Sequence, residues 1–197
     1  EQLDAIAERE AALRRVQMSC LHRELLPLLA DNGVELITTD DLSSKELMEA
    51  TDYFERDVLP ILTPLGMDTP NVVPHISNLA LSIAVQLRDT RAGSDHFAIL
   101  EVPRTLPRWV RLGTTHRYLP LERLIGANLE MVFSGFDIIS WCPFRITRDA
   151  ELGAVNPAAK SDTLATLEEN VFQRRFGEVS RLEVPSQISE GIRSRLV

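Results

Sequence analysis

The 197-residue sequence contains only two cysteines, Cys20 and Cys142, which lie far apart along the chain. Neither has a second cysteine nearby, so the sequence predicts no disulfide framework and no zinc knuckle. No apolar run approaches the roughly 20 residues that a membrane-spanning helix requires. The N-terminal segment is charged and amphipathic, unlike a signal peptide. We therefore expect a cytoplasmic protein without a transmembrane segment.

Glycine-rich phosphate-binding loops are also missing. The nine glycines stand singly, and neither G-x-x-x-x-G-K-[ST] nor G-x-G-x-x-G occurs. The four histidines are not spaced as metal ligands, and no cysteine or carboxylate pattern completes such a site. The sequence thus predicts no self-contained ATPase, no metal site and no cofactor bound by this chain.

Positive charge is scarce overall, since the formal net charge is −8 at pH 7. A nucleic-acid surface needs clustered cations to displace phosphate counterions, so we expect no nucleic-acid partner. Polyphosphate is also a polyanion, and the same argument applies to it. Only Lys45 and Lys160 are lysines, so nearly all basic residues are arginines. Arginine's planar guanidinium suits carboxylates and phosphates, but a uniform arginine bias more often reflects genome composition or a salt-rich habitat than a site.

One stretch departs from the acidic background. Between Glu101 and Glu122 there is no acidic residue. The basic residues in this interval are Arg104, Arg108, Arg111, His116 and Arg117. They could face ATP or a polyphosphate chain, or they could be a solvated loop or partners in inter-domain salt bridges. Arg148, further along, could reach toward a neighbouring domain or pair with Asp149 or Glu151.

The stretch from Tyr53 to Arg88 contains the boundary between helix and sheet. Pro60 and Pro64 cannot continue a helix, so they predict a helix end and a turn. From Leu79 to Arg88 apolar residues alternate with small or polar ones. This two-residue repeat predicts a strand with one buried face.

Helical spacing of apolar residues dominates the N-terminal part. Residues 1–31 predict one long amphipathic helix, kinked at Pro27 and ended by Asn32-Gly33. Its apolar stripe could serve as an assembly arm or could pack on the domain's own sheet. The segment 43–46, Ser-Ser-Lys-Glu, predicts a capping box for a second helix. We expect Leu47, Phe54 and Val58 to face inward from that second helix.

Further along, two more helices and three more strands are expected. The helices are predicted from Leu121 to Phe133 and from Asp162 to about 176, with a loop from Asp149 to Ser161 between them. The strands are predicted at 97–102, 136–146 and 179–184, with Pro143 marking an edge or a bulge. Several strands follow one another without a helix between them. This order favours an α+β fold, a mostly antiparallel sheet with helices packed on one side, preceded by the long N-terminal helix.

Six motifs in sequence order resemble the bacterial polyphosphate kinase family. They are LPILTPLGMD at 59–68, PHISNLALSIAV at 74–85, EVPRTLPRWV at 101–110, PLERLIGANLEMVFSG at 120–135, PFRITRDAEL at 143–152 and QRRFGEVSRLEV at 173–184. The resemblance covers most of the chain and implies the head, or middle, domain. It implies a linking helix at 1–32 from an N-terminal domain, the head domain at 33–185, and a connection toward catalytic domains at 186–197.

The resemblance also implies a function for the parent enzyme. That function is reversible transfer of the ATP γ-phosphate to polyphosphate through a phosphohistidine, with magnesium. No histidine here matches the phosphohistidine motif, so we expect no catalytic residue in this chain and no activity from it alone. Its expected role is homodimer or higher homo-oligomer assembly, contact with other domains of the polypeptide, and shaping of the substrate passage. Membrane association through the parent assembly is an alternative to a purely cytoplasmic location.

Two alternatives to this role remain. The chain could be a free-standing interaction domain. It could also be a phosphate- or polyphosphate-binding module that uses the arginines of residues 104–117. The candidate substrate-binding residues of the chain are Arg104, Arg108, Arg111 and Arg148.

Overall fold

The computed structural model describes residues 2–66, 76–148 and 179–196. The chain divides into two compact units. The first unit is made of Glu1–Tyr53 and Pro107–Leu124, and the second of Phe54–Leu106 and Ile125–Val197. The predicted loop at 149–161 and the helix predicted after it lie outside the described residues.

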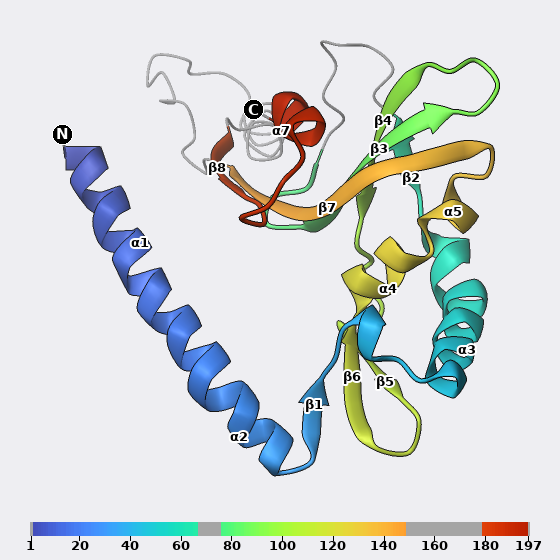
Figure 1. Ribbon diagram of the computed structural model, residues 1–197. Helices are drawn as coiled ribbons and strands as arrows, with labels where there is room; N and C mark the ends of the chain where they lie inside the picture. Colours follow the sequence, from blue (N-terminus) through green and yellow to red (C-terminus); the bar gives the residue numbers. More distant parts are fainter. Residues whose placement is uncertain (1, 67–75, 149–178, 197) are drawn as a thin grey trace, which may run out of the picture. The chain divides into compact units, whose positions relative to one another are not determined.

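A long helical segment opens the first unit (Figure 1). It consists of α1 (Gln2–Cys20), a π-helical segment (Leu21–Leu25) and α2 (Leu26–Asp31). The π-helical segment ends two residues before Pro27, whose ring would clash with a carbonyl in a regular α-helical turn. Gly33, at φ +77°, ends the segment as predicted, and its N–H donates to the Ala30 carbonyl at 2.9 Å.

The apolar stripe of this helical segment is exposed. None of residues 2–31 is buried, and Leu3 and Val16 are 80% and 70% exposed. The described residues therefore do not cover the stripe, and its packing on the domain's own sheet is not observed.

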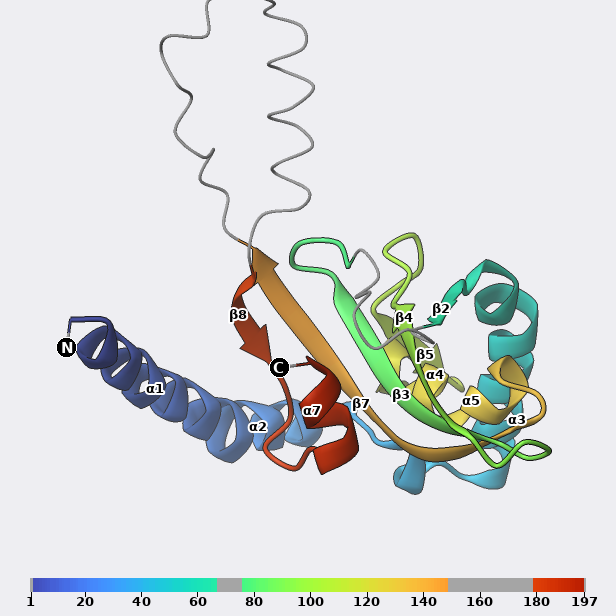
Figure 2. The same cartoon turned by 90° about the horizontal axis from the view of Figure 1, so that it is seen from above.

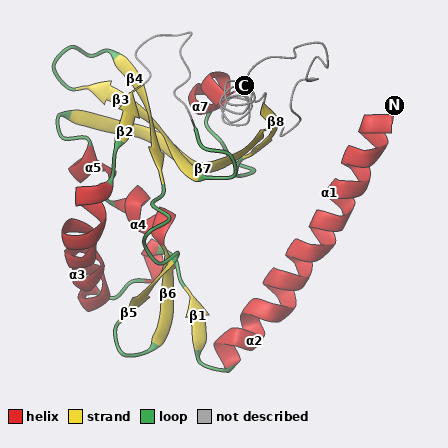
Figure 3. Cartoon of the chain, turned by 180° about the vertical axis from the view of Figure 1, so that it is seen from behind, coloured by secondary structure: helices red, strands yellow, loops and turns green. Residues whose placement is uncertain are grey.

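A three-stranded sheet forms the centre of the first unit (Figure 3). β1 (Val34–Leu36) pairs in parallel with β6 (His116–Pro120), and β6 pairs antiparallel with β5 (Trp109–Leu112). One face of this sheet is closed, because α3 (Ser44–Tyr53) contacts β5. The buried apolar residues of the sheet and of α3 are Ile37, Ala50, Val110, Leu112 and Leu119.

Local sequence signals place α3 correctly. The predicted capping box is confirmed: the Ser43 N–H donates to Glu46 Oε2 at 3.0 Å, and the Glu46 N–H donates to Ser43 Oγ at 3.3 Å. Phe54 is buried as predicted. The prediction for Leu47 is wrong, because it is 53% exposed. Glu46 and Ala50 occupy the inward face at four-residue spacing, and Leu47 is rotated about 100° away from it.

The second unit contains a five-stranded antiparallel sheet in the order β2-β4-β3-β7-β8 (Figure 2). Its strands are β2 (Pro64–Gly66), β3 (Leu81–Asp89), β4 (Asp95–Glu101), β7 (Phe136–Arg148) and β8 (Val179–Glu183). Pro143 lies on a part of β7 that pairs with β3 but is not aligned with β8, which agrees with the predicted edge position.

The strand β3 differs from its prediction in two respects. β3 begins at Leu81, because Leu79 has a left-handed backbone, φ +60°, and is 56% exposed. The prediction of one buried face is also wrong, since Ser82 and Ala84 are as fully buried as Ile83 and Val85. A central strand covered on both sides explains this pattern.

Helices cover the five-stranded sheet. α5 (Leu129–Val132) and α7 (Glu190–Leu196) lie on opposite sides of β7 in Figure 1. Ile192 of α7 is fully buried in a cluster with Phe97, Phe144 and Ile146. The α+β class with antiparallel sheets and a long N-terminal helix is confirmed, and the structure adds the smaller sheet and the helix on the second face.

Candidate functional site

The four candidate arginines fall into two pairs, one in each unit. Arg108 and Arg111 belong to the first unit, and Arg104 and Arg148 to the second. Each arginine contacts a particular set of acceptors. These acceptors decide how many N–H donors of each guanidinium remain for a ligand.

Arg108 precedes β5 and contributes to structure. Its Nη2 donates to Glu122 Oε1 at 2.7 Å, and its carbonyl accepts from the Leu121 N–H at 2.9 Å. Glu122 lies in the first turn of α4 (Leu121–Ala127). Arg108 therefore ties the start of α4 to β5, and its charge is largely neutralised.

Arg117, on β6, is also engaged. It donates to Glu46, to Glu35 Oε2 at 3.1 Å and to the Asp41 carbonyl at 2.9 Å. These bonds, to Glu46 above all, raise the pKa of Arg117. Hydrogen bonds from Ser43, then from Arg117, lower the pKa of Glu46 from 4.5 to about 2.

This network joins β1, β6 and α3, and the sequence did not reveal it. The capping box predicted one partner of Glu46. The other partner comes from a strand 71 residues away. Glu35 and Arg117 face each other across β1 and β6, a cross-strand ion pair that is visible only once the parallel pairing is known.

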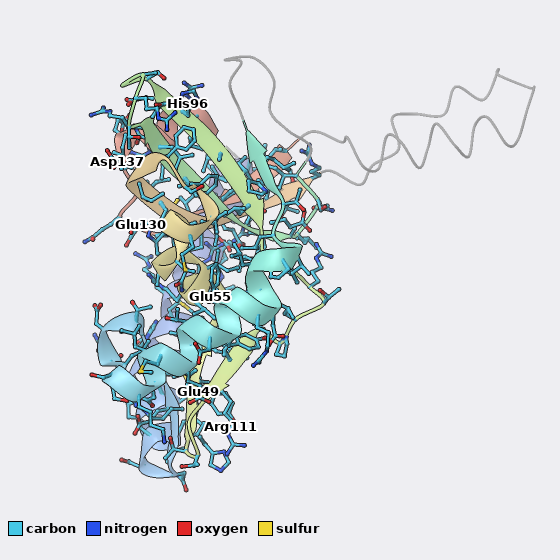
Figure 4. The ribbon with its side chains drawn as sticks, turned by 90° about the vertical axis from the view of Figure 1, so that its right-hand side faces the viewer. Glu49, Glu55, His96, Arg111, Glu130 and Asp137 are labelled. Carbon is cyan, nitrogen blue, oxygen red and sulfur yellow. The ribbon has the colours of Figure 1, made fainter. Side chains whose placement is uncertain are left out.

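Arg111, on β5, has no salt bridge to a carboxylate within the part of the chain that the structure describes. Its Nε donates to the Thr115 carbonyl and its Nη2 to the Thr114 carbonyl, both at 3.2 Å. Figure 4 labels Arg111 together with Glu49 of α3. The Glu49 carboxylate accepts from the Gly113 N–H at 2.9 Å. Arg111 is exposed, and two carbonyls hold its guanidinium in place.

Arg104 and Arg148 meet at one short segment of the second unit. Arg104 Nη2 donates to the Asn78 carbonyl at 3.2 Å. Arg148 Nε donates to the Ile76 carbonyl at 3.2 Å, and its backbone N–H donates to Asn78 Oδ1 at 2.9 Å. The structure thus brings these two arginines together around residues 76–78, a proximity that the sequence did not predict.

Within residues 2–66, 76–148 and 179–196, no three histidine, cysteine or acidic side chains gather as metal ligands. No helix in those ranges is long and apolar enough to cross a membrane. His96 Nε2 and Ser94 Oγ form a hydrogen bond of 2.9 Å, and the His96 and Phe136 rings meet edge-on with their centroids 5.5 Å apart.

Comparison with known proteins shows which family this chain resembles. The family model described as the polyphosphate kinase middle domain matches residues 45–197. The polyphosphate kinase of Mycobacterium ulcerans is 37% identical over 202 residues, which cover 98% of this chain and 27% of that protein. That of Mycobacterium avium is 37% identical over 177 residues, covering 84% of this chain and 24% of the relative.

A solved structure has the same fold. The crystal structure of polyphosphate kinase from Porphyromonas gingivalis superposes with a TM-score of 0.77 at 21% identity. The match covers 98% of this chain and 28% of that one. The chain therefore spans about a quarter of the length of the relatives that it matches.

Proposed function

Because the chain belongs to the polyphosphate kinase family and matches its middle domain, we propose that it is a non-catalytic head domain of such a kinase. Its role is assembly of the enzyme and formation of one wall of the substrate passage. Transfer of the ATP γ-phosphate to polyphosphate, with its phosphohistidine and its magnesium, belongs to the rest of the longer protein. The cytoplasm is the proposed location.

One observation carries this proposal: two arginines of the basic stretch between Glu101 and Glu122 are paired with carboxylates inside the fold. Arg108 and Arg117 form salt bridges with Glu122, Glu35 and Glu46. A transfer site would need several cations free to follow a developing negative charge. Arg108 and Arg117 thus join elements of the same domain, and this use of their charge supports an architectural role.

The test is phosphate transfer and light scattering on the isolated chain. With ATP, magnesium and polyphosphate, we expect no transfer of labelled phosphate and a scattering mass of a dimer or larger assembly. Phosphate transfer by the isolated chain would overturn the non-catalytic role. A monomeric mass at all concentrations would remove the assembly role.

A second candidate is a polyphosphate-binding module, and the meeting of Arg104 and Arg148 at residues 76–78 favours it. Titration with labelled polyphosphate at about 50 and 200 mM salt tests it, because each phosphate contact steepens the salt dependence. The change Arg104→Glu should weaken binding and flatten that dependence. Arg91→Glu, at an exposed turn in the same unit, is the control and should have a smaller effect.

A further inference from the structure

Leu79, just before β3, combines a strained backbone with an exposed side chain. Its φ of +60° is left-handed, a conformation in which the Cβ atom of an L-residue is crowded. Its side chain is 56% exposed, so the described fold gains little apolar burial from it. Stability alone favours glycine at this position, because glycine adopts a left-handed backbone without the crowding. The large side chain of Leu79 therefore needs an explanation outside the fold of one copy.

Hydrogen bonds hold the backbone around Leu79 in this conformation. The Leu79 N–H donates to the Ile146 carbonyl at 2.9 Å. The Asn78 carbonyl accepts from Arg104 Nη2 at 3.2 Å, and Asn78 Oδ1 accepts from the Arg148 N–H at 2.9 Å. These bonds fix the point at which the Leu79 side chain leaves the surface. An exposed apolar group that is already fixed loses little conformational freedom when a partner covers it.

Two arginines accompany this exposed leucine. Arg104 and Arg148 both donate to residues 76–78, directly before Leu79 in the chain. Arg104 is itself exposed. The surface thus presents one apolar side chain with positive charge at its base. Its complement is an apolar cavity with carboxylates at the rim.

The first unit contains a cavity of this kind, of about 260 Å³. Its lining consists of Leu26, Ala30, Glu35, Leu36, Ile37, Asp41 and Arg117. Two of these residues are acidic, and the basic one, Arg117, is also paired with Glu46, so the cavity carries excess negative charge. Ala30, Glu35 and Leu36 are exposed, so the cavity is open at the surface. A cavity of roughly 150 Å³ holds a benzene ring, so a leucine side chain fits here.

We propose that Leu79 of one copy inserts into this cavity on a second copy, with Arg104 facing the carboxylates of Glu35 and Asp41. The contact rests on the assembly role proposed above and names the two surfaces that meet. Each copy carries one exposed leucine and one cavity, so two different surfaces are joined. Polyphosphate binding by the same arginines does not involve Leu79, and variants of Leu79 distinguish the two.

Light scattering and urea unfolding of two variants test the leucine. Leu79→Gly and Leu79→Ala both remove the side chain, but only glycine relieves the left-handed backbone. Both should raise the dissociation constant of the assembly at least tenfold, or about the contribution of one buried leucine. At dilutions where every chain is monomeric, Leu79→Gly should unfold at a higher urea concentration than the unmodified chain. A residue that only supported the fold would not give a more stable chain that assembles less.

Mixing two variants tests the cavity. Ala30→Phe fills the cavity and keeps Leu79, whereas Leu79→Gly keeps the cavity. At a concentration where the unmodified chain assembles, each variant alone should be monomeric. An equimolar mixture should form a one-to-one complex, because Leu79 of the first variant meets the open cavity of the second. Leu47→Ala, which truncates a leucine of similar exposure, 53%, is the control and should assemble as the unmodified chain does.

The outcomes separate this contact from the assembly role itself. Circular dichroism verifies the fold of each variant. Assembly that is unchanged in Leu79→Gly, or a mixture that stays monomeric, would overturn the contact and leave the assembly role standing. An unmodified chain that is monomeric at all concentrations would overturn both.

Discussion

Gly126 shows how strictly one residue can be determined by its neighbours. A Cβ atom on Gly126 would lie 2.2 Å from two carbons of the Trp141 ring. A Cβ on Gly191 would meet Gln86 Oε1 at 2.4 Å, which is the mobile end of a side chain. The indole is rigid and wide, whereas the amide of Gln86 can turn aside. Glycine is thus required at residue 126 by close packing rather than by its backbone angles.

The two glycines therefore form a matched pair for a stability measurement. We expect Gly126→Ala to lower the free energy of unfolding by about 1–3 kcal/mol, the range for overpacking. Gly191→Ala should cost much less, because the Gln86 amide can turn aside, whereas the gain in helix propensity of about 1 kcal/mol applies to both helical positions. Urea unfolding followed by circular dichroism measures both. Equal stability of the two variants would show that the Trp141 ring yields as easily as Gln86.

The two cysteines differ in their surroundings. Cys142 is 4% exposed, and burial raises the pKa of its thiol. Cys20, on α1, is partly exposed. Because the thiolate is the reactive form, native protein should react rapidly with a thiol reagent at Cys20 only. Cys20→Ser should remove the fast phase, and denaturant should expose Cys142. A fast phase that survives Cys20→Ser would contradict the buried position of Cys142.

At the scale of elements, Glu46 links the cap of α3 to the strands. Its pKa is lowered to about 2 by Ser43 and then by Arg117. A carboxyl whose pKa is lower in the folded state stabilises that state above its ordinary pKa, and this stabilisation disappears as the pH falls from 4.5 toward 2. Glu46→Gln should therefore lower the melting temperature at pH 7, and the difference from the unmodified chain should shrink at pH 2.5.

Two variants accompany this pH experiment. Ser43→Ala removes the reciprocal cap and should cost about 0.5–2 kcal/mol at pH 7. Glu55→Gln, at an exposed position on the following helical turn, should show no such loss at any pH (Figure 4). A Glu46→Gln difference that stays constant from pH 7 to pH 2.5 would mean that its charge does not stabilise α3.

The same elements show what the sequence could predict. The cap at Ser43 and the stop at Gly33 are local signals, and both reappear in the structure. The alternation over residues 79–88 correctly indicated a strand, but β3 is buried on both faces rather than on one. The Arg117 network could not be predicted, because it depends on a parallel pairing of strands 82 residues apart. The meeting of Arg104 and Arg148 depends likewise on how distant segments fold. Motif order indicated the family, but only pairing shows which cations the fold itself uses.

At the scale of the whole molecule, α1 is the largest element with no buried residue. Its apolar side chains include Leu3, Ile6, Leu13 and Val16, each at least 60% exposed. Burial of such groups would contribute about 25 cal/mol per Å². Since α1 gains none of it from the described residues, the helix should matter little for the stability of the rest and much for any assembly that covers it.

Removal of residues 1–20 tests both statements on one sample. The free energy of unfolding should change by less than about 1 kcal/mol, because surface segments without buried contacts contribute little. Removal of residues 1–31 is the comparison. It also deletes Leu26 and Ala30, which line a cavity of 260 Å³ with Leu36 and Ile37, so it should lower the free energy of unfolding more than removal of residues 1–20 does. A large loss of stability on removing residues 1–20 would mean that α1 packs on the rest of the chain. A fall in light-scattering mass with unchanged stability would instead identify α1 as the arm through which copies assemble.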